Sequence, residues 1–163
     1  MAAKLSSRTP WRVKLEKPNV KLPKIVRVPA KWRKRFGSGT MVIAHPLDVD
    51  ALVRKVRKGS VVTQTQIRQR LAHKYRVDHT CPLTTGIFVR IVSEVAEEDR
   101  RAGKKSVTPY WRVLRDDGSL NEKFPGGPAA QARRLRAEGF AIAAGKGRKP
   151  PRVKEFEKSL ARL

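Results

Sequence analysis

Three amphipathic segments between residues 48 and 103, each bounded by helix start and stop signals, constrain the fold of this chain more than any other feature. Asp48 can cap the first segment, and Gly59 is placed to end it. Between them the apolar side chains recur at helical spacing, at Val49, Leu52, Val53 and Val56. The pattern predicts a first helix.

The second segment begins with a capping box. Thr63 is followed three residues later by Gln66, the spacing at which each side chain can cap the backbone amide of the other residue. The apolar face continues at Ile67, Leu71 and Tyr75. These signals predict a second helix that ends before the polar residues around Asp78.

The third segment can be capped by Thr84 or Thr85, and Gly103 lies beyond its end. Its periodicity predicts that the buried side chains are Ile87, Phe88, Ile91, Val92 and Val95. The acids of this segment are expected on the solvent side, at Glu94, Glu97, Glu98 and Asp99. Together with the turn between them, the second and third helices predict a helix-turn-helix pair.

A β-hairpin is predicted after the third helix. Residues 111–114 and 119–120 can form two short strands, and the Asp-Asp-Gly step between them suits a tight turn. Pro128 can occupy the first turn of a last helix, which Gly139 stops. The sequence therefore predicts a mainly α fold: a winged helix-turn-helix domain with a small β-hairpin wing and extended basic arms.

Positive charge dominates the composition. The chain has 38 Lys and Arg against 14 Asp and Glu, which gives a net charge of +24. Residues 1–36 hold twelve basic residues and one acid, and residues 141–163 hold seven and two. Such a polycation attracts phosphate backbones, so a nucleic acid is the expected partner. We expect a Pro-rich basic arm over residues 1–40, a winged-helix domain over 41–142 and a basic tail over 143–163.

The two ends carry few signals of regular structure. Basic residues alternate with proline in the N-terminal arm, which predicts an extended conformation. Trp11 and Trp32 in this arm are expected to pack back on the domain rather than stack on bases. Residues 145–152 are expected to form a flexible basic linker, and residues 153–163 could form one short helix.

Several classes of protein are disfavoured. The chain has no run of about eighteen apolar residues, and its start lacks the apolar core of a secretory signal. Cys81 is the single cysteine, and His45, His73 and His79 do not stand at ligand spacing with it. We therefore expect no disulfide, no metal, no cofactor and no membrane partner. The expected location is intracellular and reducing, in the cytoplasm and on the nucleoid, with the chain as a monomer.

Several short motifs occur in the order found in one family of DNA-repair proteins. Residues 61–67 (Val-Val-Thr-Gln-Thr-Gln-Ile) and Gly86 match its DNA-facing helices, and residues 109–113 (Pro-Tyr-Trp-Arg-Val) stand where it has Pro-Cys-His-Arg-Val. Its Asp-Gly, Gly-Gly and Glu-Gly steps follow at residues 117–118, 126–127 and 138–139. Over roughly residues 42–142 the chain thus resembles the C-terminal DNA-binding domain of the alkylguanine-DNA alkyltransferases, also called methylguanine-DNA methyltransferases, and their non-catalytic alkyltransferase-like relatives.

This resemblance implies an altered active site. Tyr110 stands at the position of the alkyl-accepting cysteine and Trp111 at that of its histidine, while the glutamate is kept as Glu138. A phenol with a pKa near ~10 is a poor nucleophile, so alkyl transfer to this position is not expected. The relatives with a bulky aromatic here bind alkylated DNA without repairing it. We expect Tyr110, Trp111 and Glu138 to line the remnant of the alkyl pocket.

The resemblance also places the DNA contacts. Gln64 stands at the family's base-flipping tyrosine, and Leu83 at the arginine that fills the vacated stack, although a leucine can still part bases as a wedge. The residues expected to contact DNA are Thr63, Gln64, Thr65, Gln66, Leu83, Thr84, Thr85, Gly86, Arg90 and Arg112. Duplex DNA, alkylated or not, is the expected partner, with a repair protein as a further one.

Two other functions stay open. Cys81 precedes the third helix and lies close in sequence to His79, which could activate it as a relocated alkyl acceptor, although a buried filler is the commoner role of a lone cysteine. The charge would equally suit an RNA- or ribosome-associated protein. A non-catalytic protein that binds duplex DNA is the hypothesis that the sequence favours.

Overall fold

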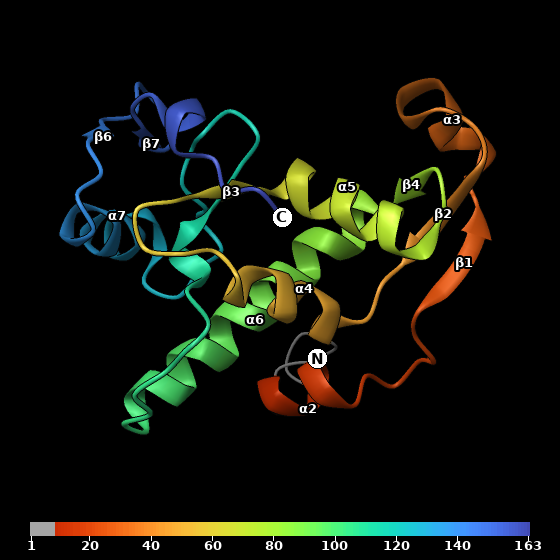
Figure 1. Cartoon of the computed structure of the whole chain (residues 1–163), viewed down its shortest axis with the longest axis horizontal. Coiled ribbons are helices and arrows are strands. Elements are labelled where there is room, and N and C mark those ends of the chain that lie inside the picture. Colours follow the sequence, from red (N-terminus) through yellow and green to blue (C-terminus); the bar gives the residue numbers. More distant parts are fainter. Residues whose placement is uncertain (1–8) are drawn as a thin grey trace.

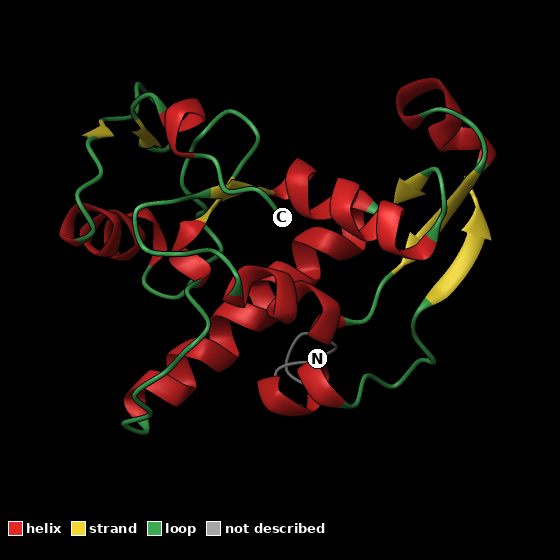
Figure 2. Ribbon diagram, viewed as in Figure 1, coloured by secondary structure: helices red, strands yellow, loops and turns green. Residues whose placement is uncertain are grey.

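The computed structural model describes residues 9–163 as a mixed α/β fold in which helices form the larger part of the regular structure (Figures 1 and 2). The α-helices of this part of the chain are α2 (Trp11–Glu16), α3 (Ala30–Phe36), α4 (Pro46–Arg54), α5 (Gln64–Tyr75), α6 (Pro82–Arg101) and α7 (Gly127–Ala137). Its strands are β1 (Lys24–Arg27), β2 (Thr40–Ile43), β3 (Val62–Thr63), β4 (His79–Thr80), β5 (Val113–Leu114), β6 (Ile142–Ala143) and β7 (Arg152–Val153). The 3-10 helices are η1 (Tyr110–Arg112) and η2 (Phe156–Ser159).

Helix α6 runs through the middle of the fold, and α2, α4 and α5 pack against it (Figure 1). Its apolar face supplies the main core with Phe88, Val89, Ile91, Val92, Val95 and Ala96. The opposing helices contribute Val49, Leu52 and Val53 from α4 and Ile67 and Leu71 from α5. Gly103 follows the end of α6 with a φ of +81°, a left-handed conformation that glycine adopts without strain. This stop residue is confirmed.

The predicted capping box of α5 is formed. The Thr63 hydroxyl accepts a hydrogen bond from the Gln66 amide at 3.3 Å, and the Gln66 side chain accepts one from the Thr63 amide at 3.0 Å. In α4 the cap differs from the prediction, because His45 is the N-cap residue and Asp48 lies one turn inside the helix. The Asp48 carboxylate still accepts from the His45 amide, so its role near the helix start is kept.

Helix α6 begins earlier than predicted and buries different residues. It starts at Pro82, so Thr84 and Thr85 lie inside its first turn and do not cap it. The predictions of a buried Ile87 and of exposed Glu97 and Asp99 are wrong, since Ile87 is 50% exposed and both acids are buried. The acids are buried because cations and hydroxyls from other segments pair with them.

Residues 9–36 are not an extended arm. They form α2, β1 and α3, and β1 pairs antiparallel with β2, which pairs in parallel with β4. The two tryptophans pack back on the domain, as predicted: Trp11 on the main core, and Trp32 on a small cluster formed by Val28, Met41 and Cys81. Local sequence patterns did not predict β1, because its partner strand β2 follows only after α3.

The predicted β-hairpin wing is not formed. Residues 110–112 are the 3-10 helix η1, and β5 pairs in parallel with β3 rather than with residues 119–120. The tight turn itself is present, with the Arg115 amide bonded to the Ser119 carbonyl oxygen at 3.0 Å. Burial explains the change: Leu114 and Leu120 both enter a second core cluster, together with Val61, Ala132, Leu135, Val153 and Phe156.

The last predicted helix is confirmed as α7, which Gly139 follows with a φ of +96°. The helix expected over residues 153–163 is wrong beyond the short η2. Instead, β7 pairs antiparallel with β6, and the Val153 amide donates to the Gly118 carbonyl oxygen at 3.0 Å. Any side chain at Gly118 would overlap the ring of Phe156, so this turn and the C-terminal segment are closely fitted.

Among the helices of residues 9–163, none combines the length and the apolar character that a membrane crossing requires.

Candidate nucleic-acid interface

An open groove of about 880 Å³ runs along the N-terminal half of α6. Its walls come from α2, from the start of α5, from α6 and from the chain that follows β5. The lining residues are Trp11, Lys14, Gln64, Pro82, Leu83, Gly86, Ile87, Arg90, Ile91, Arg115, Asp116, Asn121 and Lys123. Four segments that are distant in sequence therefore share one surface.

The groove is basic. Four cations line it, Lys14, Arg90, Arg115 and Lys123, against the single carboxylate of Asp116. That carboxylate is engaged, because it accepts a hydrogen bond from the Thr65 amide at 2.9 Å and lies 3.4 Å from a guanidinium nitrogen of Arg68. The resulting field is one that attracts an anionic ligand.

Trp11 organises two of these cations. The Lys14 ammonium lies 4.3 Å from the centroid of its indole ring, and the Arg90 guanidinium lies 5.4 Å from it. Cation–π contacts at exposed sites contribute about 0.5–1 kcal/mol each, enough to orient the side chains without neutralising them. Arg90 also forms a long ion pair with Glu94, one turn further along α6, at 3.9 Å.

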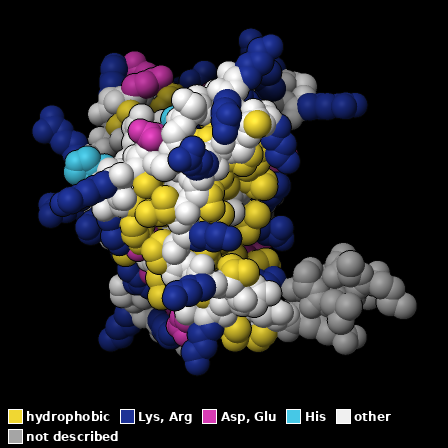
Figure 3. All heavy atoms as spheres, turned by 90° about the vertical axis from the view of Figure 1, so that its right-hand side faces the viewer, with side chains coloured by type: hydrophobic (Ala, Val, Ile, Leu, Met, Phe, Trp, Pro, Cys, Tyr) yellow, Lys and Arg dark blue, Asp and Glu magenta, His cyan; other side chains and the backbone are white. Residues whose placement is uncertain are grey.

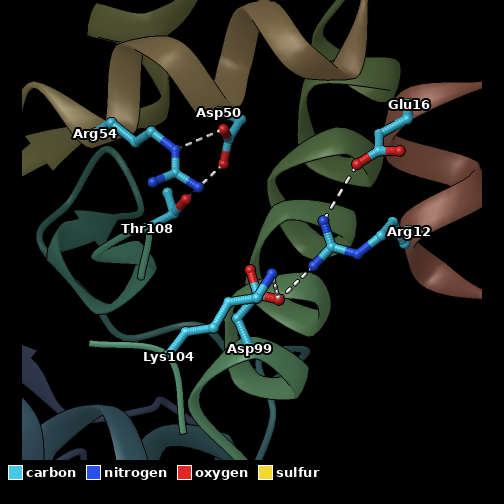
Figure 4. Close-up of polar contacts among 7 residues, drawn as sticks. All are labelled: Arg12, Glu16, Asp50, Arg54, Asp99, Lys104 and Thr108. Carbon is cyan, nitrogen blue, oxygen red and sulfur yellow. Dashed lines mark hydrogen bonds and ion pairs between the residues drawn. The ribbon is translucent and has the colours of Figure 1, made fainter. Parts of the chain in front are cut away.

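A buried acid of α6 fixes the position of α2 and hence of Trp11 and Lys14. Asp99 binds both Arg12 of α2 and Lys104, whose ammonium is 2.9 Å from the carboxylate (Figure 4). Burial alone would raise the pKa of Asp99, but hydrogen bonds from Lys104 and Arg12 outweigh it and lower the pKa below its usual 3.8. Asp99 is thus ionised at neutral pH and holds α2 against α6.

A second acid anchors the chain that leads to η1. The Asp50 carboxylate of α4 accepts a hydrogen bond from the Thr108 hydroxyl at 2.6 Å and from Arg54 at 2.8 Å (Figure 4). Thr108 is buried, so this bond fixes the segment between α6 and η1 against α4.

Two large apolar side chains project from α6 beside the groove. Leu83 is 62% exposed and Ile87 is 50% exposed, and both line the groove. Gly86 lies between them, and a Cβ there would have only the Gln64 side chain near it, at 3.9 Å. The first turns of α6 therefore combine apolar projections with a place where another backbone can approach closely.

Of the residues predicted to contact DNA, the structure brings Gln64, Leu83, Gly86 and Arg90 together in this groove. The other predicted positions serve the fold. Thr63 and Gln66 form the capping box, Gln66 also donates to the Ala161 carbonyl oxygen at 2.9 Å, and the Thr65 hydroxyl accepts from Arg68 at 2.7 Å.

Three further predicted positions lie outside the groove lining. The hydroxyls of Thr84 and Thr85 donate to the Cys81 carbonyl oxygen at 3.3 Å and 2.8 Å. Arg112 is an interior residue that donates to the Val56 carbonyl oxygen at 2.6 Å and pairs with Glu138 at 2.7 Å. Its guanidinium is therefore committed to the fold.

The two aromatic residues of the predicted alkyl-pocket remnant touch each other but donate hydrogen bonds to different glutamates. The Trp111 indole donates to Glu138 at 2.9 Å, so these two residues meet as expected. Tyr110 instead donates its hydroxyl to Glu97 of α6 at 3.0 Å, and its ring meets those of Trp111 and Phe124 edge-on. A hollow of about 380 Å³ lies beside Tyr110, lined by Arg100, Arg101, Arg133 and Arg134 among others.

Tyr110 is not an activated nucleophile. Burial and the nearby charge of Glu97 raise the pKa of its hydroxyl to about 12, so it stays protonated at neutral pH. Glu97, in contrast, is ionised at neutral pH. Burial would raise its pKa, but hydrogen bonds from Arg100 and Tyr110 and the charge of Arg134 lower it below 4.5. This arrangement is that of a structural ion network.

Cys81 has a structural environment as well. It occupies the N-cap position of α6 and is buried with Val28 and Met41. The His79 imidazole, which could have activated it, bonds instead to the Ser38 carbonyl oxygen at 3.0 Å. Within residues 9–163, no three His, Cys, Asp or Glu side chains come together as a metal site.

Sequence reasoning missed nine of the thirteen residues that line the groove. Trp11 and Lys14 were assigned to an extended arm, and Arg115 and Lys123 to the predicted hairpin and the loop after it. One signal was available: Trp11 and Lys14 stand at the three-residue spacing that places side chains on one face of a helix.

The fold and the groove together define a small mixed α/β protein with a basic, partly apolar ligand surface. Comparison of the chain with protein-family models, with curated proteins and with solved structures found no match.

Proposed function

We propose that this chain is a non-catalytic DNA-binding protein that holds duplex DNA in the groove along the N-terminal half of α6. The observation that carries the proposal is the composition of that groove, in which Lys14, Arg90, Arg115 and Lys123 surround the exposed side chains of α6. Phosphate contacts supply most of the affinity of such surfaces, and lysine and arginine are the residues that make them.

Helix α6 would be the recognition helix of a helix-turn-helix pair with α5. Leu83, Gly86 and Arg90 follow one another at spacings of three and four residues, so they lie on one face of the helix. A duplex on this face would meet an apolar side chain first, then a position without a side chain, then a guanidinium. This order supports close approach to the DNA backbone.

Sensing of alkylated guanine is the finer part of the proposal. Leu83 projects far enough to part stacked bases as an apolar wedge, and an alkylated pair is more easily opened than an intact one. The Tyr110 hydroxyl stays protonated, which supports binding without alkyl transfer. A protein with these properties would act on the nucleoid and hand the lesion to a repair partner.

The test is a fluorescence-anisotropy titration against matched duplexes, with and without one alkylated guanine, over a series of salt concentrations. The double variant Arg90→Ala/Arg115→Ala should bind both duplexes more weakly and reduce the slope of log K against log salt by about 2, about 1 per lost phosphate contact. Arg101→Ala/Lys105→Ala removes the same charge around the far end of α6 and should leave the slope nearly unchanged.

Other outcomes would contradict the proposal. Equal losses in the two double variants would mean that total charge, and not the groove, determines binding. Preference for a structured RNA competitor would favour an RNA-associated protein. A methyl group on Cys81, found by mass spectrometry after incubation with alkylated DNA, would show an enzyme with a relocated acceptor.

A further inference from the structure

A second groove, of about 700 Å³, lies on the other side of α2 and is mainly apolar. It is bounded by α2, by the segment from Lys17 to Lys24 and by α6. Its apolar lining includes Val13, Val20, Leu22, Ile43 and Phe88. Val20 is 58% exposed and Val13 is 43% exposed, although both are aliphatic and neither is covered by the described part of the chain.

Lysine side chains surround this apolar lining. Lys14, Lys17, Lys21 and Lys24 all line the groove, and no described acidic residue does. The side chains of Lys17, Lys21 and Lys24 make no hydrogen bond or ion pair within residues 9–163. Figure 3 shows hydrophobic side chains gathered in the middle of the face that carries β1, with lysine and arginine side chains around them.

We propose that this groove is a docking site for an acidic amphipathic helix of a partner protein. Such a helix would place apolar side chains at positions i, i+3 or i+4, and i+7 into the groove, and its carboxylates against the lysines. Both features of the site are then satisfied: apolar surface is removed from water, and exposed cations gain partners.

The shape and the charge favour this occupant over two others. The site is a hollow that receives side chains, whereas an interfacial membrane anchor presents a projecting apolar face to the bilayer. A second copy of this chain is unsuited, because its net charge is +24 and the buried acids Glu97 and Asp99 are already engaged by cations. The inference does not depend on the DNA-binding proposal, since Val20, Lys17 and Lys21 lie outside the basic groove.

The probe for the experiment is a fluorescent synthetic peptide of about four helical turns, with leucines on one face and glutamates elsewhere. The full chain should bind it saturably. A peptide of the same composition with leucines distributed around the helix, and one with lysines in place of glutamates, should both bind at least about tenfold more weakly. Equal binding of the first control peptide would overturn the proposal, because charge alone would then explain the interaction.

Two variants locate the site. Val20→Glu should weaken peptide binding about tenfold or more, since it puts a carboxylate among the apolar contacts, and folding should persist because the position is exposed. Lys17→Glu/Lys21→Glu should weaken binding further than Lys146→Glu/Lys149→Glu, a matched reversal on the loop between β6 and β7.

Binding to lipid vesicles tests whether the groove contacts a membrane instead. Vesicles of phosphatidylglycerol and phosphatidylcholine should bind wild type and Val20→Glu alike, through general charge. If Val20→Glu loses vesicle binding and keeps peptide binding, the groove is a membrane contact and the proposal is wrong. Thermal melting of each variant confirms that the folded state is being compared.

Discussion

The two halves of α6 use their charged side chains in opposite ways. In the C-terminal half the acids Glu97 and Asp99 are buried and bind cations from other segments. In the N-terminal half, Leu83 and Ile87 face solvent, and Arg90 has its nearest carboxylate at 3.9 Å. One half of the helix consolidates the fold, and the other is open to a ligand.

This difference explains how a chain of charge +24 folds compactly. Buried or part-buried acids, such as Asp48, Asp50, Glu97, Asp99 and Glu138, are each paired with lysine, arginine or a hydroxyl inside the structure. These acids lie where segments meet, and the excess cations stay on the surface. Charge on that surface is then available to a polyanion.

The largest effect is expected from Glu97→Ala. It would leave Arg134, Arg100 and the buried Tyr110 hydroxyl without their shared acceptor. Because both arginines stay at least part-exposed, we expect a loss of about 2 kcal/mol of unfolding free energy, mainly from the unpaired Tyr110 hydroxyl and the lost hydrogen bonds to a charged group. Urea denaturation measures the loss. Glu98→Ala, an exposed glutamate one position further, should change stability by less than ~0.5 kcal/mol; similar losses in both variants would refute a special role for Glu97.

Acid should weaken the ion pairs of the C-terminal half of α6. The pKa values of Glu97 and Asp99 are lower in the folded chain than their usual 4.5 and 3.8, so the unfolded chain binds protons first as pH falls. Their stabilisation is fully present above about pH 5 and is lost as the pH falls through the folded pKa values. Melting temperatures measured between pH 6 and 3 (roughly the range of these groups) should fall more steeply for wild type than for Glu97→Gln, and parallel curves would contradict this.

Arg12→Ala tests the contact that holds α2 in place. The guanidinium joins Glu16 and Asp99 but is part-exposed, so its loss should cost about 1 kcal/mol. Because Trp11 and Lys14 would lose their fixed position, duplex binding should also weaken, by roughly twofold to fivefold. Arg12→Lys, which keeps the charge, is the control; the proposal that α2 shapes the groove fails if binding by both variants equals that of wild type.

Leu83→Ala tests the open half of the helix. The side chain is 62% exposed, so stability should change by less than ~0.5 kcal/mol. If Leu83 parts bases, affinity for a duplex with one alkylated guanine should fall about fivefold, roughly 1 kcal/mol, with a smaller loss for the intact duplex. The control is Leu47→Ala, which removes an exposed leucine from a different helix, α4, and should change neither affinity. An equal loss for both duplexes would rule out a wedge.

Local signals predicted most of the helices. The Thr63–Gln66 box and the Gly103 and Gly139 stops act within one or two turns, so they are readable in sequence. The burial of Glu97 was not readable, because its partner Arg134 lies 37 residues further along the chain. The wing failed for the same reason. The Asp-Gly turn forms, but β5 pairs with the distant β3, and Leu114 and Leu120 are buried in a shared cluster instead of forming a hairpin.

The candidate interface divides in the same way. The residues that were predicted lie on the two helices α5 and α6, whose periodicity can be read in the sequence: Gln64, Leu83, Gly86 and Arg90. The cations from other segments, Lys14, Arg115 and Lys123, reach the groove only through tertiary packing. A charge count indicates that such residues are present but does not place them.

The smallest effect is expected from Glu94→Gln, at the border between the two halves. Burial raises the pKa of Glu94 above 4.5 despite the opposing charge of Arg90, so the carboxylate contributes no stabilisation by being ionised at neutral pH. The neutral amide should therefore leave the unfolding free energy within ~0.5 kcal/mol of wild type. Removing the only acid near Arg90 among the described ion pairs should raise duplex affinity about twofold.

Anisotropy titration of Glu94→Gln measures this rise, and Glu98→Gln, one turn further from the groove, is the control. An equal rise in both would mean that DNA responds to net charge, and that the division of α6 into a structural and a ligand-facing half does not extend to its electrostatics.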